Sequence, residues 1–307
     1  MTKTAYLFAG QGAQYLGMGR DLYDQYDIVR QTFDEAASVL GYDVRDLIDT
    51  DEEKLNQTRY TQPAILTTSV AIWRLLKEKG ARADMVAGLS LGEYSALVAS
   101  GALDFKEAVA LVAKRGEYME TAAPAGSGKM VAVLNADLDT IESACQAASI
   151  HGVVAPANYN TPAQIVIGGE VAAVDAAVAL LKEAGVKRMI PLNVSGPFHT
   201  ALLQPASRRL AEDLATISFG DFEIPLVGNT LARVMTKEEI VPLLTRQVME
   251  PVRFYDGIAC MQAAGVTEFV EIGPGTVLSG FLKKIDRSAR VQQVENLETL
   301  TAFTTEE

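Results

Sequence analysis

The chain has 307 residues, of which 49% are hydrophobic and 21% charged, a composition that is typical of packed globular proteins and excludes a disordered or fibrous one. A formal net charge of −12 argues against nucleic acid or an anionic membrane as a partner, because both would be repelled. The two cysteines, Cys145 and Cys260, lie far apart without Cys or His at metal-ligand spacing, so we expect no disulfide framework and no metal site. No apolar run approaches the ~20 residues of a membrane span, and none forms a signal-peptide core, which predicts a cytoplasmic protein.

The first 126 residues alternate between short apolar runs and helical patterns. A buried strand is predicted over 4–9, where an apolar run meets glycines, and another over 85–88. After Ser90 a helical period resumes. Further helices are predicted over 21–40, 63–79 and 104–122.

In residues 127–193 the predicted strands and helices follow a different order, β-α-β-β-α-β. The predicted strands lie at 129–135, 153–159, 164–169 and 187–192, and the predicted helices at 137–149 and 171–184. This order is that of a ferredoxin-like unit. We therefore expect a small subdomain over 127–193, inserted into a larger domain formed by 1–126 and 194–307.

The larger domain continues the alternation of helices and strands. Helices are predicted over 200–216, 236–249, 254–264 and 276–285, and strands over 225–228, 267–272 and 291–294. Strands that alternate with helices predict a mostly parallel sheet covered on both faces, as in an α/β-hydrolase-like fold. The Thr- and Glu-rich tail from Leu300 is expected to be frayed.

A candidate nucleophile lies in Gly88-Leu-Ser90-Leu-Gly92, between a predicted strand and a predicted helix. Glycines on both sides leave room for the strained turn that such an elbow requires, and a helix N-terminus follows the hydroxyl. A serine needs a base to take its proton, and the chain has only two histidines. His151 has the context of a solvated loop, whereas His199 lies where the chain returns from the predicted subdomain. We therefore expect His199 to be the base.

Two glycine-rich segments partly match the patterns of phosphate-binding loops. Gly10-Gln-Gly12-Ala-Gln14 places Tyr15 where a dinucleotide fingerprint needs a small residue, so its backbone N–H groups are more suited to an oxyanion. The segment 126–129 resembles part of a phosphate loop but lacks its first glycine and its hydroxyl residue. Arg115, on the helix predicted over 104–122, is a side chain that can pair a carboxylate through two parallel hydrogen bonds.

Taken together, these stretches resemble malonyl-CoA:acyl-carrier-protein transacylase, the acyltransferase family of type II fatty acid synthesis. The resemblance runs nearly end to end through seven stretches: FAGQGAQ at 8–14, TQPA at 61–64, GLSLGEYSAL at 88–97, ANYNTPAQIVIGG at 157–169, VSGPFHTALL at 194–203, RQVMEPVRF at 246–254 and EIGPGTVL at 271–278. Many relatives carry a histidine before the serine, where this chain has Leu89, so a polar role of that neighbour is absent here.

The resemblance implies a role for each matching residue. Ser90 would carry the malonyl group and His199 would act as its base, steadied by a main-chain carbonyl near Gln247. The backbone N–H groups of Gln11 and Leu91 would form the oxyanion hole, and Arg115 would bind the malonyl carboxylate. Substrate-binding residues would also include Asn158, Asn160 and Gln247 in the cleft.

The implied reaction moves malonyl from malonyl-CoA to acyl carrier protein by ping-pong transfer, without a metal or other cofactor. An acidic carrier would need a local basic patch on this acidic chain. Two clusters are candidates: Lys283, Lys284, Arg287 and Arg290, and Lys187 with Arg188. A serine hydrolase and a non-catalytic carrier-binding module remain alternatives. The hydrolase would require an Asp or Glu that orients the histidine.

Overall fold

The computed structural model describes residues 2–124, 126–194 and 196–306. Its first sheet is parallel and has the strand order β2-β1-β7-β8. The strands are β1 (Lys3–Phe8), β2 (Met85–Gly88), β7 (Val266–Ile272) and β8 (Arg290–Val294). β1 and β7 lie in the middle and are apolar along most of their length, as expected for strands that are covered on both faces.

The strand predicted over 225–228 is wrong. Only isolated bridges form here, between Leu226 and Val86 and between Val227 and Val234. Pro225 has no N–H to donate to a ladder, and the chain turns away after Gly228. This segment therefore only touches the outer edge of β2, and it leads directly into Asn229.

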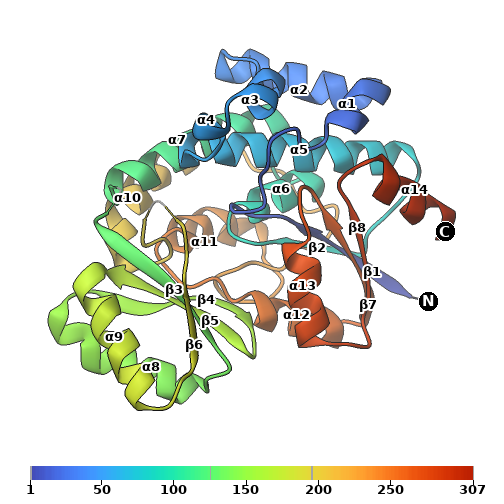
Figure 1. Cartoon of the computed structure of the whole chain (residues 1–307). Helices are drawn as coiled ribbons and strands as arrows, with labels where there is room; N and C mark the ends of the chain where they lie inside the picture. Colours follow the sequence, from blue (N-terminus) through green and yellow to red (C-terminus); the bar gives the residue numbers. More distant parts are fainter. Residues whose placement is uncertain (1, 125, 195, 307) are drawn as a thin grey trace.

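The N-terminal helices form two layers over one face of the parallel sheet. Figure 1 shows α5 and α6 next to the strands and α1, α2 and α3 on the far side of α5. The helices are α1 (Arg20–Gln25), α2 (Asp27–Leu40), α3 (Val44–Thr50), α4 (Glu52–Leu55), α5 (Thr58–Glu78), α6 (Gly92–Ala99) and α7 (Phe105–Ala122). The helix predicted over 21–40 is interrupted at Tyr26, whose backbone is extended with φ of −119°. Helix α5 begins before Pro63 and continues through it, so the prediction that this helix begins at 63 was wrong.

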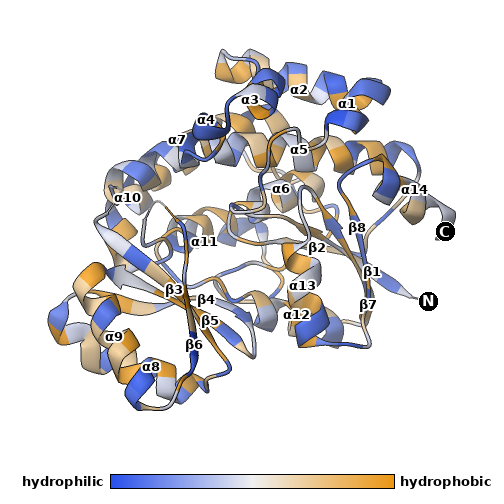
Figure 2. Cartoon of the chain, in the orientation of Figure 1, coloured by the Kyte–Doolittle hydropathy of each residue, from blue (hydrophilic) through white to orange (hydrophobic). Residues whose placement is uncertain are grey.

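The second sheet is antiparallel and has the strand order β4-β5-β3-β6. It consists of β3 (Gly128–Leu134), β4 (Val154–Thr161), β5 (Gln164–Glu170) and β6 (Arg188–Pro191), with helices α8 (Leu138–Ala148) and α9 (Val171–Glu183) and the short 3-10 helix η1 (Ser149–His151). The buried residues of α8 and α9 form a separate apolar core with the sheet, and both helices carry hydrophobic and hydrophilic residues along their length (Figure 2). Residues 125 and 195, which flank this unit, lie outside the described residues.

The remaining elements are helices that follow the antiparallel unit in the chain and alternate with β7 and β8. They are η2 (Ala201–Leu203), α10 (Gln204–Leu214), η3 (Lys237–Glu239), α11 (Ile240–Gln247), α12 (Phe254–Ala263), α13 (Val277–Ile285) and α14 (Leu297–Glu306). The segment after α11 joins the two sheets, because the Tyr159 N–H donates to the Val252 carbonyl at 2.8 Å and the Val252 N–H to the Ala157 carbonyl at 2.9 Å.

The prediction of a frayed tail from Leu300 is also wrong. Helix α14 includes this residue, and the side chains of Leu300 and Phe303 are buried in the main core. Asn296 caps the start of this helix, since its side-chain oxygen accepts from the Thr299 N–H at 2.9 Å. Among the helices that the structure describes, none is long and apolar enough to cross a bilayer.

Candidate active site

Ser90 lies on the sharp turn between β2 and α6, at the carboxyl end of the parallel sheet. Its backbone is in the left-handed region with φ of 53°, which is strained for a residue with a Cβ atom. The neighbouring glycines make the turn possible. A Cβ on Gly88 would lie 2.0 Å from the Gly92 carbonyl, and one on Gly92 would lie 2.1 Å from the Phe8 carbonyl oxygen. The turn therefore holds the serine hydroxyl directly above the start of α6.

His199 faces Ser90 from the segment that follows the antiparallel sheet. Its Nε2 lies 2.8 Å from Ser90 Oγ, and its Nδ1 lies 2.7 Å from the main-chain carbonyl oxygen of Gln247. A carbonyl can only accept, so Nδ1 carries the proton and Nε2 is left to accept the serine proton. Burial, followed by the nearby positive charge of Arg115, lowers the pKa of His199 to about 4. The imidazole is therefore neutral at physiological pH and is able to act as a base.

Arg115 projects from α7 into the same site and is 1% exposed. Its guanidinium donates to Gln62 Oε1 at 2.8 Å, to Gln247 Oε1 at 2.9 Å and to Ser90 Oγ at 3.2 Å. All three acceptors are neutral, and within the described part of the chain Nε has no hydrogen-bond partner and no carboxylate forms an ion pair with the side chain. Burying a cation without a carboxylate in direct contact costs free energy, and an anionic group bound beside Arg115 would offset this cost.

Asn229 and Gln247 tie the serine turn to the arginine. Asn229 accepts from the Ser90 N–H at 2.7 Å and donates to the Gly88 carbonyl at 2.7 Å. Gln247 Nε2 donates to the Ser90 carbonyl at 2.9 Å and to the carboxylate of Glu93 at 2.6 Å. Of Asn229 and Gln247, only Gln247 was predicted from sequence as a site residue.

The residues that the sequence analysis missed are Gln62, Glu93 and Asn229. Gln62 and Glu93 lie inside recognised stretches, and an acid beside Ser90 in the first turn of an otherwise apolar helix was a usable signal for Glu93. Asn229 follows the segment that was predicted as a strand, and nothing in its neighbourhood pointed to Ser90.

The Gly10–Gln14 loop approaches the turn closely, since a Cβ on Gly10 would lie 2.4 Å from the Leu89 carbonyl oxygen. The Gln11 side chain donates to Thr58 Oγ1 at 3.0 Å. No acceptor for the backbone N–H groups of Gln11 and Leu91 is found among the described residues. Two donors near Ser90 are thus available to a ligand.

Asn158 and Asn160 lie on β4. Asn160 is buried, and its Oδ1 has no partner in the described part of the structure. No hydrogen bond among the described residues joins either amide to Ser90, His199 or Arg115. His151 lies apart from the site at the exposed end of η1.

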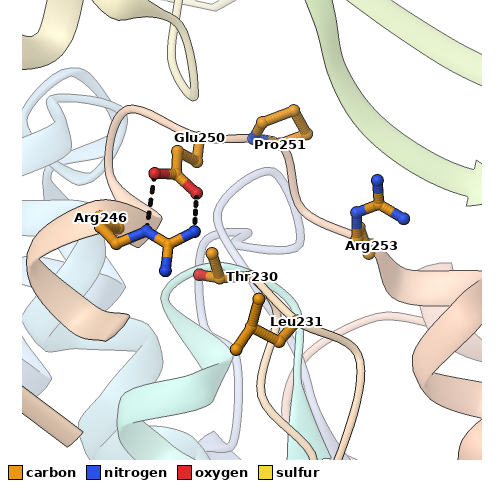
Figure 3. A pocket seen from close by; sticks show the side chains of 6 residues that line it. All are labelled: Thr230, Leu231, Arg246, Glu250, Pro251 and Arg253. Carbon is orange, nitrogen blue, oxygen red and sulfur yellow. Dashed lines mark hydrogen bonds and ion pairs between the residues drawn. The ribbon is translucent and has the colours of Figure 1, made fainter. Parts of the chain in front are cut away.

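A pocket of about 390 Å³ opens beside this site and is lined by Thr230, Leu231, Arg246, Glu250, Pro251 and Arg253 (Figure 3). Thr230 follows Asn229 in the chain and Arg246 precedes Gln247. Both arginines of the pocket are already paired, Arg246 with Glu250 and Arg253 with Asp256. Among the described residues, no cluster of His, Cys, Asp or Glu could hold a metal ion.

Comparisons with known proteins agree with this arrangement. The family described as "Acyl transferase domain" matches residues 5–303. Malonyl CoA-acyl carrier protein transacylases of Bacillus subtilis (strain 168) and Escherichia coli (strain K12) are 47% and 45% identical over 303 and 288 residues. The matches cover 98% and 93% of this chain and 96% and 93% of the relatives.

Solved structures agree as well. The crystal structure of MCAT from Streptococcus pneumoniae has a TM-score of 0.98 and 72% identity, and the match covers 99% of this chain and 100% of that one. A malonyl-transacylase in complex with a type II PKS acyl-carrier protein has a TM-score of 0.97 and 42% identity, with 100% of both chains covered. These near end-to-end matches confirm the resemblance found in the sequence: the chain belongs to the malonyl CoA-acyl carrier protein transacylase family of acyl transferases.

Proposed function

We propose that this chain transfers the malonyl group of malonyl-CoA to the phosphopantetheine thiol of acyl carrier protein, through a malonyl ester on Ser90, and so supplies malonyl units for fatty acid elongation. The observation that carries the proposal is the buried Arg115, which donates to Ser90 Oγ at 3.2 Å and forms no direct ion pair with any carboxylate of the described residues. Acyl transfer requires the serine and its base, whereas a cation at this place is needed only for an acyl group that carries its own negative charge.

The chemistry follows from the geometry of Ser90 and His199. His199 Nε2 takes the hydroxyl proton while Ser90 Oγ attacks the thioester carbon, and the N–H groups of Gln11 and Leu91 stabilise the oxyanion. The carbon–sulfur bond then breaks, and the coenzyme A thiol leaves with the proton from His199. The carrier thiol next gives its proton to His199 and attacks the ester carbon. The bond to Ser90 Oγ then breaks, His199 returns the proton to Oγ, and malonyl remains on the carrier sulfur.

Arg115 is the proposed binding residue for the malonyl carboxylate, which would complete its hydrogen bonds in two parallel contacts. Gln247 would hold the guanidinium in position through its Oε1, at 2.9 Å. Asn158 and Asn160 are proposed to line the cleft on the side of the antiparallel sheet, where Asn160 Oδ1 is a buried acceptor in need of a donor.

The carrier is proposed to dock on a basic patch at the C-terminal end of α13, which we define as Lys283 and Lys284 in its last turn and Arg287 just beyond it. These side chains are exposed, and the described residues include no carboxylate in an ion pair with any of them, whereas Arg290 pairs with Glu268. Helix α13 also begins close to the loop that contains Gln11, because a Cβ on Gly275 would lie 3.5 Å from the Ala13 carbonyl oxygen. Lys187 and Arg188, on the antiparallel unit, form the alternative patch.

We further propose to classify the larger part, 1–126 and 194–307, as α/β-hydrolase-like, and the part over 127–193 as a ferredoxin-like subdomain. The strand order β4-β5-β3-β6 and the separate apolar core support this division. A cytoplasmic location and a reaction without metal or other cofactor stay predictions from the sequence.

The test is two-substrate steady-state kinetics with malonyl-CoA and acyl carrier protein. A covalent intermediate predicts parallel double-reciprocal lines, and intersecting lines would contradict it. Steady release of free malonate without carrier would instead favour the hydrolase alternative. That alternative has less support, because a main-chain carbonyl and not an acid contacts His199 Nδ1.

A further inference from the structure

Glu93 is a buried acid beside Ser90, and the proposed reaction does not use this acid. It lies in the first turn of α6, is 1% exposed, and forms no ion pair within the described part of the chain. One carboxylate oxygen accepts from the Asn229 N–H at 3.2 Å, and the other accepts from Gln247 Nε2 at 2.6 Å. Burying a carboxylate costs free energy, so its retention here calls for a role.

The Gln247 amide is oriented by three acceptors around its Nε2, of which Glu93 is the nearest and the only carboxylate. Gln247 Nε2 lies close to Glu93 Oε2, to the Ser90 carbonyl at 2.9 Å and to Asn229 Oδ1 at 3.3 Å, all of which are acceptors. The amide oxygen is thereby turned to the other side, where it accepts from Arg115 at 2.9 Å. Gln247 thus stands between a buried carboxylate and a buried guanidinium that would otherwise pair directly.

We propose that Glu93 is a positioning residue for acyl-group selection: it fixes the orientation of the Gln247 amide, which holds Arg115 through a neutral oxygen and keeps the guanidinium available for the carboxylate of the substrate. The inference rests on the proposed function and adds a selectivity determinant to it. Glu93 acts through Gln247 and does not touch the acyl group.

A carboxylate is the side chain that fits this place, because both of its oxygens accept. A glutamine at 93 has the same shape but one NH2 group. If its oxygen faces the Asn229 N–H, its NH2 meets the NH2 of Gln247; in the other orientation, its NH2 meets the Asn229 N–H. Both arrangements place donor against donor. The first, which keeps the Asn229 contact, is relieved by a flip of Gln247, which would point an NH2 group at Arg115.

The test compares the rates of acyl-enzyme formation from malonyl-CoA and from acetyl-CoA in wild type and in Glu93→Gln. Measurements are made at pH 8, where Glu93 is ionised even though burial raises its pKa to about 7. We expect the malonyl rate to fall at least about tenfold, since a hydrogen-bond array to a charged group is disrupted, while the acetyl rate changes little. An equal fall in both rates, or no fall in either, would overturn the inference.

Glu271→Gln is the matched control. Glu271 is also a buried acid, but its carboxylate accepts from the backbone N–H groups of Leu278 and Ser279, at 3.0 and 2.7 Å, at the start of α13. This variant should lower the melting temperature without changing the ratio of malonyl to acetyl rates. A changed ratio in the control would overturn the assignment to Glu93.

If Glu93→Gln does not fold, Gln247→Glu provides the second test. It places a carboxylate directly against Arg115, so the malonyl rate should fall far more than the acetyl rate, and an unchanged ratio would overturn the inference. The proposed function is judged separately on the wild type. A wild-type enzyme that forms no malonyl ester would refute that function, and the inference with it.

Discussion

Ser90 and His199 both adopt left-handed backbone conformations, with φ of 53° and 59°. Such conformations cost about 1–3 kcal/mol each in residues other than glycine, so the surrounding structure must hold them. Asn229 accepts from the Ser90 N–H, and the His199 N–H donates to the Val248 carbonyl at 3.2 Å. The two reacting side chains are therefore preorganised by main-chain hydrogen bonds that are formed before any substrate arrives.

Arg115→Ala tests the carboxylate clamp. Loss of charge-assisted hydrogen bonds to the malonyl carboxylate should cost about 2–3 kcal/mol in transition-state binding, roughly a 30- to 150-fold fall in kcat/KM for malonyl-CoA. Acetyl-CoA should gain relative to malonyl-CoA, because no buried cation is left unpaired in its complex. The measurement is kcat/KM for both thioesters, and a variant that keeps its malonyl preference would place the clamp elsewhere.

The lowered pKa of His199 predicts an unusual pH profile. Because burial and Arg115 lower this pKa from 6.5 to about 4, the imidazole stays neutral well below pH 6.5 and gains a proton only as the pH approaches 4. The rate at which an uncharged sulfonyl fluoride modifies Ser90 should thus be nearly constant from pH 7 to about pH 5. A half-loss of the rate near pH 6.5 would contradict this account of the site.

At the residue scale, sequence alone indicated Ser90, His199 and Gln247, because each lies in a recognisable stretch, and Arg115, whose role followed from the resemblance as a whole. Gln62, Glu93 and Asn229 were missed. Their hydrogen bonds join segments that are distant in the chain, 53 residues apart for Gln62 with Arg115 and 139 for Asn229 with Ser90, and a contact at such a separation leaves no local pattern.

The turn between β2 and α6 is the element on which the site depends, and it permits a direct test. Gly92→Ala places a Cβ 2.1 Å from the Phe8 carbonyl oxygen, so we expect a loss of about 2–4 kcal/mol in unfolding free energy together with loss of acylation. The measurement is urea unfolding.

Gly280→Ala is the control for this change. Gly280 is also helical, but a Cβ there would meet no atom within 4 Å. The substitution should stabilise the protein by about 0.5–1 kcal/mol, since alanine favours a helix over glycine. Equal stability of the Gly92 and Gly280 variants would contradict the steric argument.

Element prediction succeeded where periodicity and flanking glycines agreed, as for β2 and the strands and helices between 128 and 191. It failed at 225–228, where a short apolar run lacks partners for a full strand, and at the tail, where α14 is fixed by burial of Leu300 and Phe303. In both cases tertiary contacts decided the outcome, and these cannot be read from local pattern.

At the scale of the whole molecule, the net charge is −12, so an acidic carrier is expected to bind where exposed cations gather on the surface. Charge reversal in the patch on α13, by Lys283→Glu with Lys284→Glu, should raise the KM for an acidic carrier several-fold at low salt and leave that for malonyl-CoA unchanged. The matched control is Lys187→Glu with Arg188→Glu. A larger effect in the control pair would move the docking site to the antiparallel unit.

The two sheets meet where α11 ends. Its last residue, Gln247, supplies its carbonyl to His199, and Val252 in the segment that follows pairs with β4. Residues from 62 to 247 therefore converge on Ser90 only in the complete fold, and no isolated part of the chain contains the whole site.

The most direct test of this account is the intact mass of the protein after brief mixing with malonyl-CoA, for wild type and Ser90→Ala. We predict a gain of about 86 Da on the wild type, none on the variant, and loss of the added mass when acyl carrier protein is supplied. A wild type that gains no mass, or a Ser90→Ala variant that gains it equally, would contradict the central claim.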